Sequence, residues 1–444
     1  MLLSTLFIFA SGFWYPFVFF AAAVLIVGII FLDFNDILCV LVYMAMFGAM
    51  LVPFIASTIA AFVTIVIKYV LDVKHKKVEF LKVPFIITTF IVVLYSLIHY
   101  EVNDLGLYQG LMMIAFLYLI YFVVVYRKKL AFHKIFDYLF LGLISSIVVS
   151  VLVYFIPGTQ TLMFSETEYI MTSLKSKVVY DDGEYARLVL MSFHVNHLAA
   201  FCLFAMAYSS IKVLTKQERP LKEKIYYIVM YLTNVAVGLL TLSKAFIIVF
   251  AFEVFVTIIY YIATHKKQAL KIIFVLLAAI GLLVVVFGQR FMDIFERFFV
   301  YNYDTLLGML TTGRSAIWQQ YVNAILESPL KLLFGFGFFS QEQLLIGPHN
   351  FYIFLLYRFG VFGILLITYL IYAYYMSIKV KLNFSIKHCL ILLTFLVIGL
   401  QEACVDERFY FFIIGMAIMF INDKPKKENL VQEQKEIKSL DKNI

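Results

Sequence analysis

Charged residues are scarce in this chain of 444 residues. Asp, Glu, Lys and Arg together make up only 14% of it, whereas hydrophobic residues make up 64%. Soluble globular domains carry about one quarter charged residues, so the composition excludes a water-soluble enzyme and predicts a polytopic membrane protein. The 48 Phe and 30 Tyr agree, because lipid, unlike water, does not penalise aromatic side chains that face outward from a helix.

Cysteine is also sparse, and so are motifs that bind metals or cofactors. Four cysteines lie in or beside apolar runs without paired spacing, which favours neither a disulfide framework nor a zinc site. Asp181, Asp182 and Glu184 could offer oxygen ligands to Mg²⁺, but the DDG at this point is more typical of a solvated turn. The chain has no nucleotide-binding motif, and we expect no cofactor and no resident metal.

The net charge of +8 comes largely from short basic clusters between apolar runs, at 74–82, 127–129 and 216–224. Such clusters mark the cytoplasmic side of a membrane protein. We therefore place these junctions inside the cell and predict no nucleic-acid partner. The amino terminus lacks the basic region and cleavage site of a signal peptide, so we expect its first segment to be retained.

The apolar runs predict an all-α polytopic membrane protein with 12 to 14 transmembrane helices of about 20 residues each. The first run is short, is ended by Pro16, and could be a re-entrant piece. We expect one integral membrane domain over 1–422, with extracytoplasmic loops at 158–189 and 289–348, and a disordered cytoplasmic tail over 423–444. The predicted spans lie near 2–14, 16–31, 37–51, 54–72, 83–100, 107–126, 133–156, 190–213, 225–241, 245–263, 271–288, 350–378, 388–402 and 408–421.

Cations on the predicted outer side need a separate explanation, since Lys and Arg concentrate inside. Arg187 ends the first outer loop, shortly before Asn196 enters an apolar run. Lys244 lies in a predicted tight turn between two spans. For Lys244 the alternative is a long stem that carries its ammonium to the membrane interface.

The second outer loop contains a predicted helix, TTGRSAIWQQYVNAILESP, whose apolar residues recur at helical spacing until Pro329. We expect this helix to lie along the outer membrane face. Arg314 stands at its amino-terminal end, where the helix dipole repels a cation. A bound anion would remove the conflict, because free helix amides and a forked guanidinium together bind phosphate or diphosphate. An ion pair of Arg314 with Glu327 or Asp304 is the alternative.

Further polar residues follow this loop. His349 precedes a long span, where the helix dipole favours a neutral imidazole that accepts a proton; the alternative is an interfacial histidine among the headgroups. Arg358 lies deeper in that span, and a charge within the membrane is a functional hypothesis by default. Glu402 could act as a base, or it could pair with Arg408 or Arg358.

Three stretches resemble the O-antigen ligase and Wzy-type polysaccharide polymerase superfamily: LTLSK at 240–244, TTGRSAIW at 311–318 and PHNFYIFLLYRFGVFG at 348–363. The resemblance covers about 187–408 and implies a GT-C-like bundle with short helices in a large extracytoplasmic loop. It also implies that Arg187, Arg314 and the cation at 244 contact the diphosphate of a polyprenyl-linked glycan, with His349 beside the reacting sugars. The family usually has Arg where this chain has Lys244, so bidentate recognition of phosphate is lost at this position.

These features predict a polysaccharide polymerase in the cytoplasmic membrane of a bacterium, active at the outer face. It would join polyprenyl-diphosphate-linked oligosaccharide repeat units for a capsule, an exopolysaccharide or O-antigen, by metal-independent transfer with inversion. Cations would stabilise the departing diphosphate, and a base would assist the acceptor hydroxyl. The candidate catalytic residues are His349, Arg314 and Glu402, and the candidate binding residues are Arg187, Lys244, Asn196, Asn350, Arg358 and Arg408.

Two alternatives remain open at this point. One is a ligase that moves the glycan to another acceptor. The other is a lipid-linked oligosaccharide flippase, which would instead place charges along a central cavity and have short loops on both sides. The expected partners are the lipid-linked oligosaccharide, membrane lipid, and flippase and chain-length regulator proteins.

Overall fold

The structure is a computed structural model of the whole chain, and it is helical apart from one small hairpin in the part that it describes. The described residues are 1–11, 16–48, 51–98, 104–155, 179–181, 186–188, 190, 195–214, 220–264, 314–339 and 350–378, with single positions between 274 and 292 and between 390 and 399.

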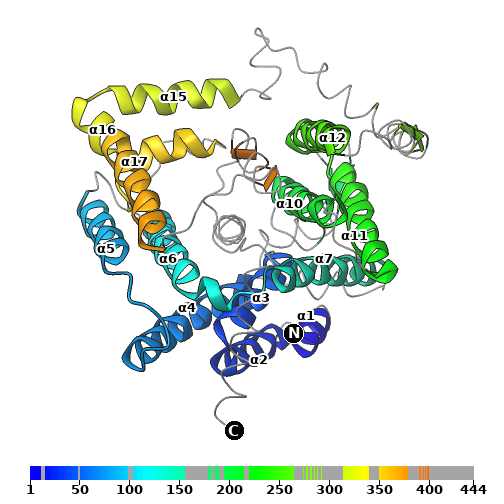
Figure 1. Ribbon diagram of the computed structural model, residues 1–444, viewed down its shortest axis with the longest axis horizontal. Coiled ribbons are helices and arrows are strands. Elements are labelled where there is room, and N and C mark those ends of the chain that lie inside the picture. Colours follow the sequence, from blue (N-terminus) through cyan, green and yellow to red (C-terminus); the bar gives the residue numbers. More distant parts are fainter. Residues whose placement is uncertain are drawn as a thin grey trace, which may run out of the picture.

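The helices follow the apolar runs of the sequence (Figure 1). Their bounds are α1 Leu2–Ala10, α2 Phe17–Phe31, α3 Phe34–Ala45, α4 Leu51–Lys74, α5 Lys82–Leu97, α6 Asp104–Tyr126, the 3-10 turn η1 Arg127–Lys129, α7 Phe132–Phe155, α10 Val195–Leu214, α11 Leu221–Leu240, α12 Lys244–Thr264, α15 Arg314–Leu326, α16 Pro329–Phe334 and α17 Phe351–Ile378; the hairpin pairs β1 Val179–Asp181 with β2 Ala186–Leu188.

Three helices of the described residues are long and apolar enough to cross a membrane, at Val52–Lys74, His133–Leu152 and Phe351–Ile378. The expected number of 12 to 14 spans is not confirmed. Helix α1 has nine residues, about 14 Å of helix, which is less than half of the hydrocarbon thickness. Helix α3 has 12 residues, of which ten are buried, and an apolar helix of that length is typical of a protein core. Neither of these two predicted spans is therefore confirmed as a full crossing by the described residues.

The long helix α17 is broken rather than continuous. Gly360 has φ 60° and ψ −174°, so the helical backbone is interrupted there. The first half of α17 lies beside α15, and the second half turns away from it (Figure 1). The predicted span over 350–378 therefore consists of a short first helix and a second helix from 361 to 378.

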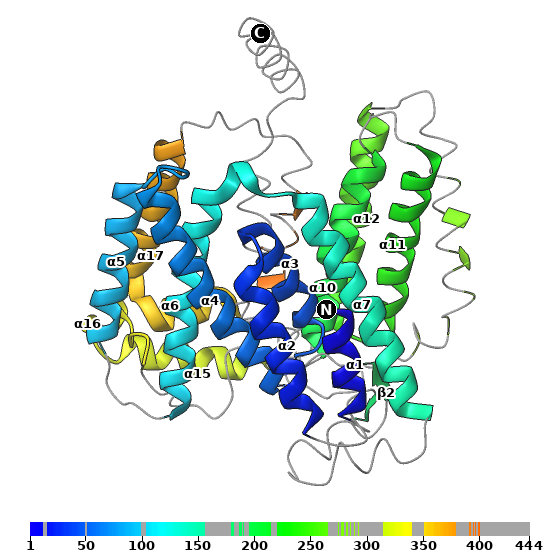
Figure 2. The same ribbon diagram turned by 90° about the horizontal axis from the view of Figure 1, so that it is seen from below.

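The helix junctions divide between the two ends of the bundle. Figure 2 shows η1 and the end of α17 at one end, and α15 with strand β2 at the opposite end. The chain alternates in direction along α4, α5, α6 and α7, so the basic junctions at 74–82 and 127–129 share one end. The predicted alternation of basic junctions agrees with this arrangement. Helix α15 lies across the ends of its neighbours, as expected for a helix along a membrane face.

Candidate functional site

The hairpin places Arg187 at the α15 end of the bundle. Arg187 lies in β2, where its backbone is paired with Tyr180 of β1. Strand β2 contacts α11, and α10 begins a few residues after the strand, at Val195. The chain thus leads from Arg187 directly into the helix that carries Asn196.

The predicted tight turn between the spans near Ser243 is confirmed, and its hydrogen bonds explain its shape. Helix α11 ends at Leu240 with Thr241 as its C-cap, and Leu242 adopts a positive φ of 50°. The Thr241 hydroxyl donates to the carbonyl of Gly238 at 2.6 Å and accepts from the amide of Ser243 at 3.3 Å. The chain can therefore reverse within three residues and begin α12 at Lys244.

This turn brings Lys244 next to Asn196. The Ser243 hydroxyl donates to Oδ1 of Asn196 at 3.1 Å, which ties the turn to the start of α10. Only 8% of Lys244 is exposed, so the residue lies within the helix packing and not on an open interfacial surface. Gly238 permits this packing, because an added Cβ would lie 2.0 Å from the ring of Phe246. Two candidate binding residues from distant parts of the sequence are thus joined through Ser243.

Arg314 is the first residue of α15, as predicted, and it is half-buried. The pair of Arg314 with Glu327 does not form, because 13 residues along α15 separate them by about 20 Å. The Glu327 carboxylate instead pairs with Lys331 at 2.7 Å. Asp304, the other suggested partner, lies outside the described residues.

Helix α15 is held by an aromatic cluster against the first half of α17. Tyr321 meets the edge of Tyr357 with ring centres 4.9 Å apart, and Phe336 stacks on Tyr357 at 4.1 Å. All three rings are buried. This packing fixes the direction of α15 and hence the position of Arg314 at its amino-terminal end.

Asn350 forms the amino-terminal cap of α17. Its side-chain oxygen accepts hydrogen bonds from the amides of Tyr352 at 3.0 Å and Ile353 at 3.1 Å, and the residue is 5% exposed. A cap of this kind satisfies amides that have no partner within the helix. The structure thus gives Asn350 a structural contact, while its contact with substrate stays a prediction.

Arg358 lies at the crossing of α17 with the segment after α16. It is fully buried, and its Nη1 donates to the carbonyls of Gly337 and Phe338, each at 3.4 Å. Its guanidinium carbon lies 5.5 Å from the ring centre of Phe354. The cation therefore holds the protein backbone at this crossing, and its contact with substrate stays a prediction.

Three glycines allow the backbones to approach at this crossing. Gly335, Gly337 and Gly360 have φ values of 69°, 82° and 60°, which other residues adopt rarely. An added Cβ on Gly337 would lie 1.6 Å from the carbonyl oxygen of Ile98 in the turn after α5. The backbone amides of Phe336 and Gly337 donate to the carbonyls of residues 357 and 358 at 2.8 and 2.9 Å. The GxG of the sequence, a weak signal alone, thus marks a close contact of three chain segments.

Glu253 is a buried acid that the sequence reasoning missed. It lies in α12, 2% exposed, nine residues after Lys244, and its Oε1 accepts a hydrogen bond from the Thr394 hydroxyl at 2.7 Å. The sequence contains the feature that indicates this residue, because Glu253 is an acid within the apolar run AFEVFVTII. Like Arg358, it is a charged residue within a predicted span, and such residues are functional candidates. At about 14 Å along the helix from Lys244, Glu253 lies well away from the turn.

Three of the predicted site residues, His349, Glu402 and Arg408, lie outside the described residues. Within the described part of the chain, no group of three His, Cys, Asp or Glu side chains could hold a metal ion. The structure thus brings together Asn196, Ser243 and Lys244, and places Arg314 and Asn350 around the paired helices α15 and α17.

No curated protein and no solved structure matches the chain. The family model described as O-antigen ligase matches residues 229–368. This segment contains the turn with Lys244, the start of α15 at Arg314, and the crossing at Arg358. The match confirms the resemblance of this membrane protein to the O-antigen ligase and Wzy-type superfamily, and residues 229–368 carry it.

Proposed function

We propose that this protein is a polysaccharide polymerase that joins polyprenyl-diphosphate-linked oligosaccharide units at the outer face of a bacterial cytoplasmic membrane. The family match supports a ligase or polymerase type of function on lipid-linked oligosaccharides. In this proposal residues 1–422 form one membrane domain, with 158–189 and 289–348 outside and the tail 423–444 inside.

One observation carries the proposal. The matched segment has a cation at the first position of two helices, Lys244 in α12 and Arg314 in α15. A helix start carries partial positive charge and unpaired amides, so an anion bound there is attracted both by the helix and by the cation at its first position. In the alternating arrangement of Figure 2, both helix starts belong to the end that carries β2. A diphosphate is an anion that suits such a surface.

The proposed reaction is a direct displacement at the donor sugar. The acceptor hydroxyl attacks the anomeric carbon of the donor sugar, the bond from that carbon to the diphosphate oxygen breaks, and the lipid diphosphate leaves with the electron pair. Arg187, Lys244 and Arg314 stabilise the charge on the leaving diphosphate. His349 or Glu402 accepts the proton of the acceptor hydroxyl. A single displacement of this kind inverts the anomeric configuration.

The remaining candidate residues have supporting positions in this proposal. Asn196 hydrogen-bonds to Ser243 beside Lys244 and thereby orients the turn toward the diphosphate. Asn350 fixes the start of α17, which determines where the preceding residue His349 can lie. We place Arg408 beside the acceptor glycan.

The test is reconstitution of the purified chain in liposomes with a synthetic prenyl-diphosphate repeat unit, without added metal or nucleotide. Products lengthened by whole repeat units are expected, with an inverted linkage. Transfer to an added lipid or protein acceptor without lengthening would indicate a ligase. Transbilayer movement alone would indicate a flippase and contradict the proposal.

Two variants test the residues in the same assay. Arg314→Ala and His349→Ala are each expected to abolish lengthening while insertion into the membrane is unchanged. Lys222→Ala is the matched control, because it removes a cation from the start of α11 at the opposite end of the bundle. Wild-type lengthening in both test variants would remove these residues from the mechanism.

A further inference from the structure

A basic pocket lies at the end of the bundle opposite the proposed active site. It has a volume of about 420 Å³ and lies between the turn that follows α4 and the turn η1 that follows α6. Four cations, Lys76, Lys77, Arg127 and Lys129, line it with a single acid, Glu79. Neither the family match, which begins at residue 229, nor the proposed transfer reaction involves these residues.

The acid does little to neutralise these four cations. Glu79 lies 3.9 Å from Nη2 of Arg127, and 71% of its side chain is exposed. Exposed and distant ion pairs of this kind contribute little to stability. Lys76 and Lys77 form no ion pair with a described residue. Lys129 lies 3.7 Å from Asp72 of a neighbouring pocket, so the excess of positive charge lies on Lys76, Lys77 and Arg127.

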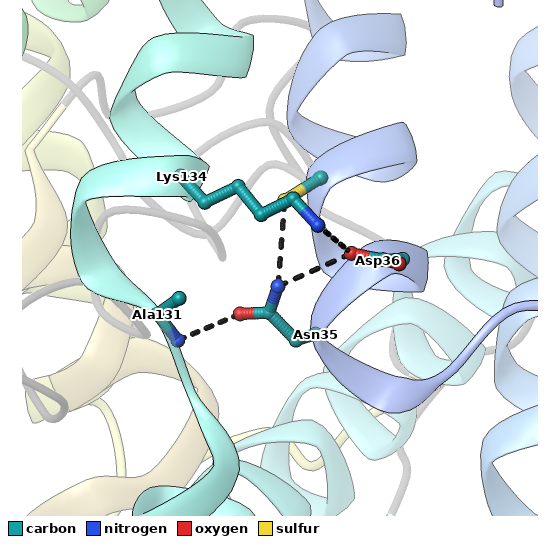
Figure 3. A network of polar contacts seen from close by, with 5 residues as sticks. Asn35, Asp36, Ala131 and Lys134 are labelled. Carbon is teal, nitrogen blue, oxygen red and sulfur yellow. Dashed lines mark hydrogen bonds and ion pairs between the residues drawn. The ribbon is translucent and has the colours of Figure 1, made fainter.

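A neighbouring pocket in the same region has equal numbers of positive and negative side chains, in contrast to the first pocket. It has a volume of about 490 Å³ and shares Tyr126 and Lys129 with the first pocket. Lys134 pairs there with Asp36 at 2.6 Å, and Asn35 donates to Asp36 at 3.3 Å and accepts from the amide of Ala131 (Figure 3). Its charged residues are three lysines and three aspartates: Lys68, Lys129 and Lys134 with Asp33, Asp36 and Asp72.

Arg127 is the most constrained of the four cations. It is 8% exposed, and its Nη1 donates to the carbonyl of Val124 at 3.0 Å. Burial lowers the pKa of its guanidinium, which means that the charged form lacks part of its solvation. An anion in the pocket would supply a close counter-charge for the guanidinium and would add charge-assisted hydrogen bonds.

The preference of Lys and Arg for the inner side of a membrane explains why cations gather at this end. It does not explain why four of them face one cavity. Lys222 and Lys224 belong to another basic junction at the start of α11, yet they line neither pocket. Membrane topology alone therefore does not explain why these cations line the first pocket.

The surroundings of the pocket suit a ligand with an apolar part. Phe80 lines the pocket and is 46% exposed, and Val70, Leu71 and Val83 are exposed on the adjoining helices. We propose that this pocket binds the phosphate group of a phosphate-bearing ligand, with an acidic phospholipid as the source that the apolar border favours. The lipid chains would lie along α4 and α5 while the headgroup phosphate enters the pocket.

The experiment uses the full chain purified in a neutral detergent. Binding of dioleoyl-phosphatidylglycerol and of dioleoyl-phosphatidylcholine is measured by native mass spectrometry over a range of lipid concentrations. The double variant K76Q/K77Q tests the pocket, and K222Q/K224Q is the control, because it removes the same charge at the same end of the bundle. Both pairs of lysines are at or near the surface, so their replacement should not disturb folding.

We expect the wild-type protein and K222Q/K224Q to bind phosphatidylglycerol at least about tenfold more tightly than K76Q/K77Q does. Phosphatidylcholine should bind weakly to all three. Equal weakening by the two double variants, or equal binding of the two lipids, would overturn the proposal. Two further arms identify the source of the phosphate: full displacement of the lipid by millimolar inorganic phosphate supports a soluble phosphate ligand, and retention of the lipid supports the headgroup.

Discussion

Two buried cations of the matched segment lie in different kinds of surroundings. Arg358 donates to backbone carbonyls at the glycine crossing, so the fold itself uses its guanidinium. Lys244 begins a helix in a turn lined by the polar side chains of Ser243 and Asn196. Burial is similar in the two places, yet the neighbours differ. The role of a charged residue within an apolar helix therefore depends on the groups that it contacts and not on how deeply it is buried.

The largest expected effect comes from the glycine crossing. Gly337→Ala should lower the free energy of unfolding by at least about 3 kcal/mol, because it combines a positive φ with severe overpacking. Thermal unfolding of the purified chain in detergent measures this effect.

Gly28→Ala is the control for this substitution, since an added Cβ on Gly28 in α2 meets nothing within 4 Å. This control should be neutral or stabilising by about 0.5 to 1 kcal/mol. Equal unfolding midpoints for the two variants would contradict the close approach at the crossing.

The second-largest expected effect is on the rate of glycan lengthening, and it tests the role of Lys244. Removal of its charge in Lys244→Gln should slow lengthening by about 100-fold, as loss of one stabilising group for a developing charge usually does. Lys244→Arg should retain at least wild-type activity, because a guanidinium can contact two phosphate oxygens at once. Lengthening rates at equal amounts of reconstituted protein decide the outcome, and a Gln variant as active as wild type would exclude a role in diphosphate binding.

The variant Arg358→Lys tests whether Arg358, unlike Lys244, has a structural role. We expect a loss of about 1.5 kcal/mol in the free energy of unfolding, because the shorter lysine holds its ammonium farther from the two carbonyls and loses the planar contact of the guanidinium with Phe354. The lengthening rate per folded molecule should stay the same. A normal unfolding midpoint with a strongly reduced rate would instead support the contact of Arg358 with substrate that the sequence predicted.

The smallest effect concerns the cap of α17. Asn350→Ala should cost about 1 kcal/mol, and Asn350→Ser should restore most of it, since serine also accepts from helix amides. Unfolding midpoints of the two variants measure the difference. If lengthening fails in the serine variant while its stability is normal, Asn350 acts on the substrate and not only on the helix.

Local features of the sequence predicted local structure well. The period of apolar residues and Pro329 predicted the helix that the structure places at Arg314–Leu326, and the short polar stretch around Ser243 predicted the turn. Such features depend on neighbouring residues, whose spacing can be read directly.

Features that depend on distant segments could not be predicted in the same way. The break at Gly360 exists because the backbone of residues 333–335 packs against it, and Gly337 contacts Ile98 in the turn after α5, far earlier in the chain. The contact of Ser243 with Asn196 also joins separate helices. His349, Glu402 and Arg408 stay predictions, since they lie outside the described residues.

The most direct measurement is photolabelling with a prenyl diphosphate that carries a diazirine next to the diphosphate, followed by peptide mapping of the purified chain. We predict labelling of peptides that contain the turn at 241–244 and the start of α15 at Arg314, and competition by the unlabelled repeat-unit donor. Labelling confined to the basic pocket around Lys76 and Arg127, or spread without competition, would contradict a diphosphate site at the α15 end of the bundle.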